Sequence, residues 1–296
     1  MLSLELLLIQ IINGLFIGFV FTLVALGLSI VMGLLGVVNF AHGALYMLGA
    51  YVGYTLICLL SQNYVLGFIS VVFACAGAGL IIFLAIVKPL KSKGRPPLDF
   101  LIALIGVNMI MEESIKSIWG AEPKYLPIPQ IFSGQIAFGS LLLPKYQLCI
   151  IAISSVVLLL IYYFFYKTDV GIRSLASVED PETASLQGVN LTRLGLLIFV
   201  IGAAVAGAGG ILIGPIFSVT PTMGIEVLGL IFVIVIFGGL GSLEGTFLAS
   251  ILICEIRSLG SIFLPETLAE MLVYCLLLLI LITRPRGIKG YAGILE

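Results

Sequence analysis

The sequence predicts an all-α membrane protein, a bundle of about eight or nine transmembrane helices of which some are broken. Of the 296 residues, 61% are hydrophobic and only 10% are charged, whereas soluble domains are roughly 45–50% apolar. Apolar runs of spanning length, about 20 residues, follow one another from end to end. The alternating ten-residue segments of a membrane β-barrel are absent. We therefore expect residues 1–296 to form one membrane domain.

The first half of the chain contains four expected spans. The first apolar run, residues 6–35, would be about 45 Å long as one helix against a hydrocarbon core of roughly 30 Å. It must tilt, protrude or break, and the glycines at positions 27, 33 and 36 favour a break near its end. Residues 44–60, 65–87 and 98–118 are the next three spans.

The second half contains a fifth span at residues 148–166, a sixth at 191–214 and a last one at 268–282. Residues 224–262 are too long for one crossing and short for two, and the sequence GGLGS at 238–242 interrupts them. Two short or re-entrant helices are therefore expected there, since transporters build central sites from such discontinuous helices.

The basic residues predict the orientation. Residues 88–95, 167–193 and 283–289 carry four, three and three of the 14 Lys and Arg residues. By the positive-inside rule these segments are cytoplasmic. The proline-rich loop at 120–145 is then external, and Ser133-Gly134 within it suggests the turn of a small β-hairpin.

The long polar interruption at 167–193 predicts a surface helix. Asp180 is a good N-cap, and Pro181 suits the first helical position. Gly188 can end the helix in a left-handed conformation. A helix over residues 181–187 is too short to be stable alone, so we expect this segment to dock on a soluble partner at the cytoplasmic surface.

Polar residues within the apolar part require a reason, because a charge at the bilayer centre costs about 2.5–3.5 kcal/mol on insertion scales. They either line a translocation pathway or cap and join broken helices. Asn39 favours a cap, and Asn13 a hydrogen bond to a neighbouring helix. The candidates for the pathway are Asn13, Asn39, His42, Gly43, Gly241 and Glu244.

No enzyme motif is present, so we expect a transport protein without a cofactor or metal of its own. The single histidine excludes a HExxH zinc site, and none of the five cysteines is paired at a metal-binding spacing. The chain has no GxxxxGK[ST] sequence for ATP. Energy must therefore come from another subunit or from an ion gradient.

Several motifs together resemble one known family. Asn39-Phe40-Ala41-His42-Gly43, the GGLGS sequence and Arg284-Pro285-Arg286-Gly287 are similar to the LivH-type permease subunit of branched-chain amino acid ABC importers. The cytoplasmic segment matches as well, although Leu175-Ala176 stands where the family usually has Arg-Ala. The resemblance assigns the coupling to an ATPase to Gly171, Arg173, Ala176, Glu179, Asp180, Pro181, Ala184 and Gly188.

The resemblance implies a type II ABC importer fold in the inner membrane of a bacterium or archaeon. It also implies a LivM-like second permease, two cytoplasmic ATPases that bind ATP and Mg²⁺, and an external substrate-binding protein. No nucleic-acid partner is expected. Related permeases carry urea, amides or other neutral amino acids, so the substrate stays open.

The alternative is an ion-coupled secondary transporter, or a channel, that acts without an ATPase on a small neutral solute. In that case Glu244 or Glu112 would serve as the coupling group.

Overall fold

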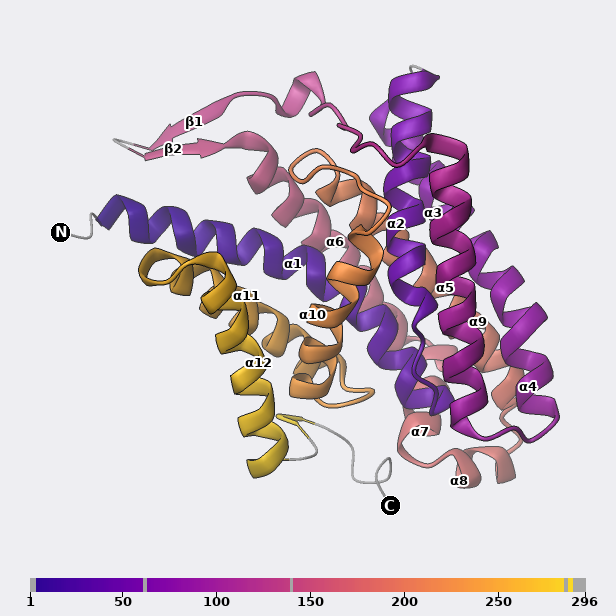
Figure 1. Ribbon diagram of the computed structural model, residues 1–296. Helices are drawn as coiled ribbons and strands as arrows, with labels where there is room; N and C mark the ends of the chain where they lie inside the picture. The colour runs from indigo at the N-terminus through magenta and orange to yellow at the C-terminus, as the bar shows by residue number, and fades with distance from the viewer. Residues whose placement is uncertain (1–3, 61–62, 139–140, 285–286, 290–296) are drawn as a thin grey trace.

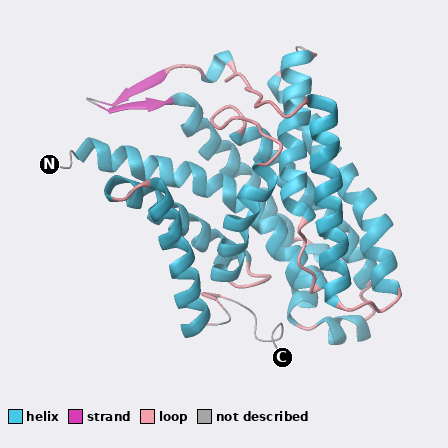
Figure 2. Cartoon of the chain, in the orientation of Figure 1, coloured by secondary structure: helices cyan, strands magenta, loops and turns pink. Residues whose placement is uncertain are grey.

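The computed structural model describes residues 4–60, 63–138, 141–284 and 287–289, and it is almost entirely helical (Figures 1 and 2). Within the described part, six helices are long and apolar enough to cross a membrane, two more are apolar but shorter, and a ninth has spanning length only. They are α1 (Leu4–Leu35), α2 (Ala41–Tyr54), α3 (Tyr64–Ile82), α5 (Pro97–Trp119), α6 (Lys145–Lys167), α9 (Leu191–Ile213), α10 (Met223–Gly238), α11 (Leu243–Phe263) and α12 (Glu266–Thr283). The all-α, multi-pass character is confirmed, while the number of eight or nine spans stays a prediction because six of these helices are both long and apolar enough to span.

Short elements join these helices. A π-helical turn, η1 (Thr55–Leu59), extends α2, and a second, η2 (Phe83–Val87), continues α3 into α4 (Lys88–Ser92). The basic residues expected in a loop at 88–95 are therefore partly helical. The cytoplasmic segment folds into α7 (Asp169–Glu179) and α8 (Pro181–Leu186), while the external loop contains η3 (Gln130–Phe132), β1 (Gln135–Phe138) and β2 (Leu141–Pro144).

The three basic segments share one end of the bundle. Figure 1 shows α4, α7, α8 and the end of α12 in the lower part of the view, with the β-hairpin at the top. This arrangement is what a single cytoplasmic face requires. If the basic end is cytoplasmic, as the sequence predicts, the start of α1 belongs to the external side.

The expected break within the first span is not observed. Helix α1 is continuous for 32 residues and ends at Leu35; Gly36 then adopts φ +65°. Gly27 instead faces the backbone of α9, because a Cβ there would lie 2.9 Å from the Gly202 carbonyl oxygen. The helix accommodates its length by lying strongly tilted relative to the neighbouring helices (Figure 1).

The break at GGLGS is confirmed. Helix α10 ends at Gly238 and α11 begins at Leu243. Gly239 and Gly241 have φ values of +101° and +77°, a region that residues other than glycine rarely occupy. The interruption therefore depends on the glycines that the sequence supplies.

The β-hairpin exists, but its turn was predicted at the wrong place. Ser133 and Gly134 precede β1, and the strands pair from Gln135↔Pro144 to Phe138↔Leu141. The connection therefore falls at residues 139 and 140, outside the described residues. The Leu141–Pro144 stretch supplies the second strand, which was not predicted from the sequence.

Glycine brings the central helices into backbone contact. Gly49 of α2 packs on Gly207 of α9 so closely that no Cβ fits, and Gly210 of α9 packs in the same way on the carbonyl of Tyr46. Lipid tails are as apolar as the helices, so helices in a bilayer associate chiefly through such close packing.

We predict that Gly49→Ala destabilises the protein, because the new methyl group meets backbone that cannot rotate away. Overpacking of this kind costs about 1–3 kcal/mol. The control is Gly77→Ala on α3, where a Cβ meets nothing within 4 Å. Thermal unfolding in detergent should show a lower Tm for Gly49→Ala and an undiminished Tm for the control; equal values would contradict the packing role.

Candidate translocation cavity and coupling surface

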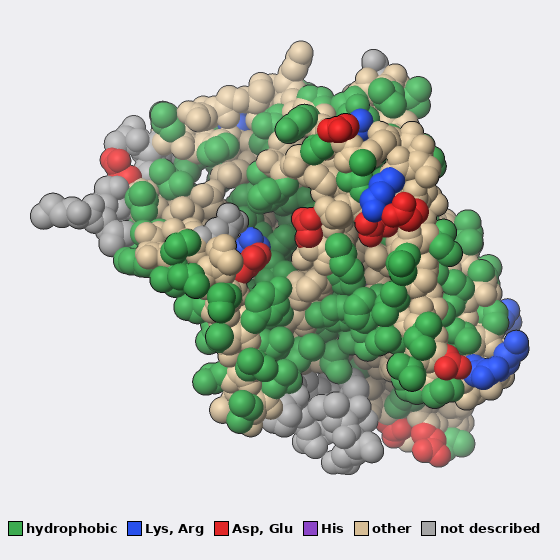
Figure 3. All heavy atoms as spheres, in the orientation of Figure 1, with side chains coloured by type: hydrophobic (Ala, Val, Ile, Leu, Met, Phe, Trp, Pro, Cys, Tyr) green, Lys and Arg blue, Asp and Glu red, His purple; other side chains and the backbone are tan. Residues whose placement is uncertain are grey.

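A cavity of about 850 Å³ opens on the external half of the bundle. Its walls come from α1, α10, α11 and α12, with contributions from the first turn of α6 and the connection between α9 and α10. Figure 3 shows this face hollowed between α1 and α10. Its volume lies within the roughly 300–1,000 Å³ typical of sites for small molecules.

The cavity has both apolar and polar walls. Its most buried lining residues include Phe16, Tyr46 and Ile213, which are at most 2% exposed. The charged residues are Glu226 on α10, Arg257 on α11 and Glu270 on α12; Arg257 and Glu270 form an ion pair of 2.8 Å. The uncharged polar side chains are Gln10, Asn13, Gln147, Ser218, Thr220, Thr222, Ser258 and Ser261.

Hydrogen bonds between helices fix part of this lining. The Gln147 amide donates to Asn13 Oδ1 over 3.1 Å, which joins α6 to α1. The Ser258 hydroxyl donates to the Gln10 carbonyl over 2.7 Å, which joins α11 to α1. Asn13 thus makes the expected bond to a neighbouring helix and also lines the cavity.

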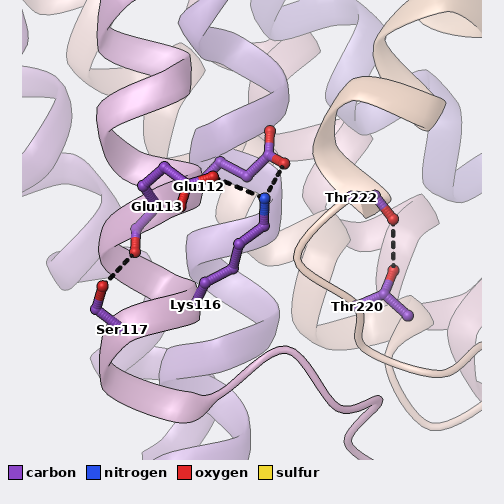
Figure 4. A network of polar contacts seen from close by, with 6 residues as sticks. All are labelled: Glu112, Glu113, Lys116, Ser117, Thr220 and Thr222. Carbon is purple, nitrogen blue, oxygen red and sulfur yellow. Dashed lines mark hydrogen bonds and ion pairs between the residues drawn. The ribbon is translucent and has the colours of Figure 1, made fainter.

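A second polar cluster lies close to the outer mouth. On α5, Lys116 contacts both Glu112 and Glu113 at 2.8 Å. Figure 4 shows this cluster facing the segment that carries Thr220 and Thr222, both of which line the cavity. Because Glu112 is neutralised by Lys116, the contact does not favour Glu112 as an ion-coupling group.

Three of the pathway candidates, Asn39, His42 and Gly43, lie together at the start of α2. Asn39 Oδ1 accepts the Ala41 N–H over 3.1 Å, the cap-like bond that the sequence favours. His42 is fully buried, with Nε2 2.9 Å from the Val24 carbonyl oxygen of α1. Gly43 packs on the Gly224 carbonyl of α10 with no room for a Cβ. The His42 and Gly43 contacts join α2 to α1 and α10, the Asn39 bond is local, and none of the three residues lines the cavity.

The remaining two candidates lie at the α10–α11 break. The Gly241 N–H donates to the Ser29 hydroxyl of α1 over 3.1 Å, and Thr246 Oγ1 donates to the same oxygen over 3.0 Å. Glu244 pairs with Lys289 at 2.6 Å, and both side chains are about half exposed. The structure therefore places Gly241 in a buried polar contact and Glu244 at the surface.

The cytoplasmic segment contacts the break through one glycine. A Cβ on Gly33 of α1 would lie 2.7 Å from the Gly241 Cα and 3.1 Å from Val178 Cγ1 of α7. Val178 is only 1% exposed. The contact Val178–Gly33–Gly241 thus connects the surface helices directly to the interrupted membrane helices.

Helices α7 and α8 expose most of the residues assigned to coupling. Gly171 and Ala184 are buried, and Gly171 packs so closely on the Phe164 carbonyl that no Cβ fits. Exposed residues of the set are Arg173, Ala176, Glu179, Asp180, Pro181 and Gly188.

The start and end of α8 follow the sequence prediction. Asp180 Oδ1 accepts the Thr183 N–H over 3.0 Å at the N-cap, and Gly188 ends the helix with φ +85°. Hydrogen bonds from the Thr183 side chain and backbone lower the pKa of the Asp180 carboxyl. The cap is therefore ionised at neutral pH and weakens only as the pH falls through that lowered pKa.

Sequence reasoning missed three residues of this region. Leu186, at 83% exposure, is a large apolar side chain presented to solvent at the end of α8. A leucine in an otherwise polar six-residue helix is a signal of an exposed contact residue that the sequence alone could have supplied. Val178 and Ser29 gave no such signal, because their importance depends on which neighbours the fold brings to them.

Comparison with known proteins shows that the chain is similar to membrane permeases. A family model described as a branched-chain amino acid transport system permease component matches residues 10–281. The high-affinity branched-chain amino acid transport system permease protein LivH of Salmonella typhimurium is 30% identical over 95% of this chain and 94% of its own length.

Two further relatives are also named as branched-chain amino acid transport permeases. The permease BraD of Pseudomonas aeruginosa is 28% identical over 95% of each chain. The probable LivH of Methanocaldococcus jannaschii is 27% identical over 90% of this chain and 88% of its own. No solved structure matches the chain. The chain is a multi-pass membrane protein and a transport subunit, and it belongs to the family of branched-chain amino acid transport system permease components.

Proposed function

We propose that this chain is the permease subunit of an ATP-driven importer that moves branched-chain amino acids into the cytoplasm by alternating access. In this proposal an external binding protein delivers the substrate and two cytoplasmic ATPases hold ATP and Mg²⁺. A second, LivM-like permease completes the complex in the bacterial or archaeal inner membrane. The chain itself holds no cofactor.

The contact Val178–Gly33–Gly241 carries this proposal. An ATPase that moves α7 and α8 would press on α1 and on the α10–α11 break at the same point. Discrete rearrangements at packed interfaces transmit such movements well, because packed interfaces do not deform continuously. The exposed Leu186 gives the ATPase an apolar side chain to bury.

The cavity supports a substrate with a charged head and an apolar side chain. Glu226 offers an anion to an ammonium group, and Arg257, which already pairs with Glu270, lies in the same lining and would share its cation with a substrate carboxylate. Phe16, Ile17 and Phe21 present apolar surface beside them. A branched-chain amino acid combines these three features.

The first test is uptake of radiolabelled leucine by vesicles that contain the complete importer. We predict uptake that requires internal ATP, and competition by isoleucine and valine rather than by urea, alanine or glutamate. Uptake driven by an ion gradient in vesicles that contain this chain alone would overturn the proposal in favour of the secondary transporter.

The second test addresses coupling. Asp180→Lys removes the cap of α8 and places a cation at the positive end of the helix, so we predict that uptake falls at least about tenfold while ATP hydrolysis continues. Gln187→Lys adds the same charge at the other end of α8 and should leave both activities near wild type. If transport and coupled hydrolysis both survive Asp180→Lys, this segment is not the coupling element.

A further inference from the structure

A second cavity, separate from the external one, is lined partly by exposed apolar residues such as Leu159 and Leu248. It is an apolar groove of about 510 Å³ bounded by α1, α6 and α11. Figure 1 shows α1 running between the other two helices. The lining runs from the middle of α1 and α6 toward the cytoplasmic side, as far as Leu26 and Tyr162, and includes the first residues of α11 from Leu243.

Among the described residues, the lining at the cytoplasmic mouth of this groove contains one cation and one anion. Lys289 Nζ and Glu244 Oε2 are 2.6 Å apart, and their side chains are 48% and 51% exposed. Both residues line the groove. A ligand at this mouth would therefore contact a positive and a negative side chain next to the apolar groove.

Lys289 is held at this mouth by the fold. Its backbone N–H donates to the Gly238 carbonyl over 3.1 Å, and the Ile288 N–H donates to the Phe237 carbonyl over 2.9 Å. Gly287, with φ +73°, packs on the backbone of Gly239 at the α10–α11 break. The mouth is thus part of the same interruption that defines the membrane helices.

We propose that this groove binds one phospholipid of the cytoplasmic leaflet with a zwitterionic, hydrogen-bonding head group, of the phosphatidylethanolamine type. The phosphate binds Lys289, the primary ammonium binds Glu244, and an acyl chain fills the groove. An acyl chain that enters the groove leaves one apolar environment for another and gains only packing. The head group therefore decides which lipid is retained.

The pair of charges excludes the other common lipid classes. An anionic head group gains from Lys289 but is repelled by Glu244. A choline head group has the right charges but no N–H to donate to the carboxylate. Hydrogen bonds to charged groups contribute about 1.5–3 kcal/mol, so we expect roughly tenfold or greater preference for phosphatidylethanolamine.

The test is native mass spectrometry of the complete importer, purified from nanodiscs of phosphatidylethanolamine, phosphatidylglycerol and phosphatidylcholine in equal parts. Leu159→Trp places an indole in the groove, while Leu160→Trp is the control. The two leucines are neighbours with 67% and 63% exposure, but only Leu159 lines the groove. We expect retained phosphatidylethanolamine in wild type and Leu160→Trp, and its loss by about tenfold in Leu159→Trp.

Variants of the two charged residues test the contribution of the lipid head group separately from that of the acyl chain. Lys289→Gln should lower lipid retention, and Glu244→Gln should shift it toward phosphatidylglycerol. Equal retention of the three lipids by the wild type would overturn the proposal. So would a photo-crosslinker at Leu159 that joins the partner permease in place of lipid, because the groove would then be a protein interface.

Discussion

Close contact between backbones, made possible by glycine, is the constraint on which the rest of the structure depends. Lipid offers helices no hydrophobic reason to associate, so small residues and buried hydrogen bonds must hold the bundle together. Gly49 on Gly207 joins α2 to α9, and Gly43 on Gly224 joins α2 to α10. Because these contacts leave no room for a side chain, the helices can exchange one packing for another but cannot slide gradually.

The same constraint connects the cytoplasmic surface to the membrane. Gly33 is the point where α7, α1 and the α10–α11 break meet, and Ser29 one turn earlier supplies the hydrogen bond that holds Gly241. A buried N–H left without a partner costs about 1–3 kcal/mol, so the break is held in a defined geometry. A displacement of Val178 therefore acts on a packed contact for which few other packing arrangements exist.

Local chemistry made much of the fold predictable. The hydrophobic runs gave the spans, the GGLGS glycines gave the α10–α11 break, and Asp180, Pro181 and Gly188 gave the bounds of α8, because each signal lies within a few residues of its effect. Contacts between distant segments were not predictable. Gly27 was expected to break the first helix, but its missing side chain instead allows α9 to pack closely against α1. Likewise, only the fold shows that Asn13 lines a cavity while His42 does not.

The role of the Val178–Gly33–Gly241 contact is tested most directly by replacing Gly33 with alanine in the complete importer and measuring leucine uptake per ATP hydrolysed. The added methyl group would lie 2.7 Å from the Gly241 Cα, so uptake per ATP should fall severalfold while ATP hydrolysis persists. Gly106→Ala on α5, where a Cβ meets nothing within 4 Å, should leave the ratio unchanged. An unchanged ratio in Gly33→Ala, in a correctly assembled complex, would contradict transmission through this contact.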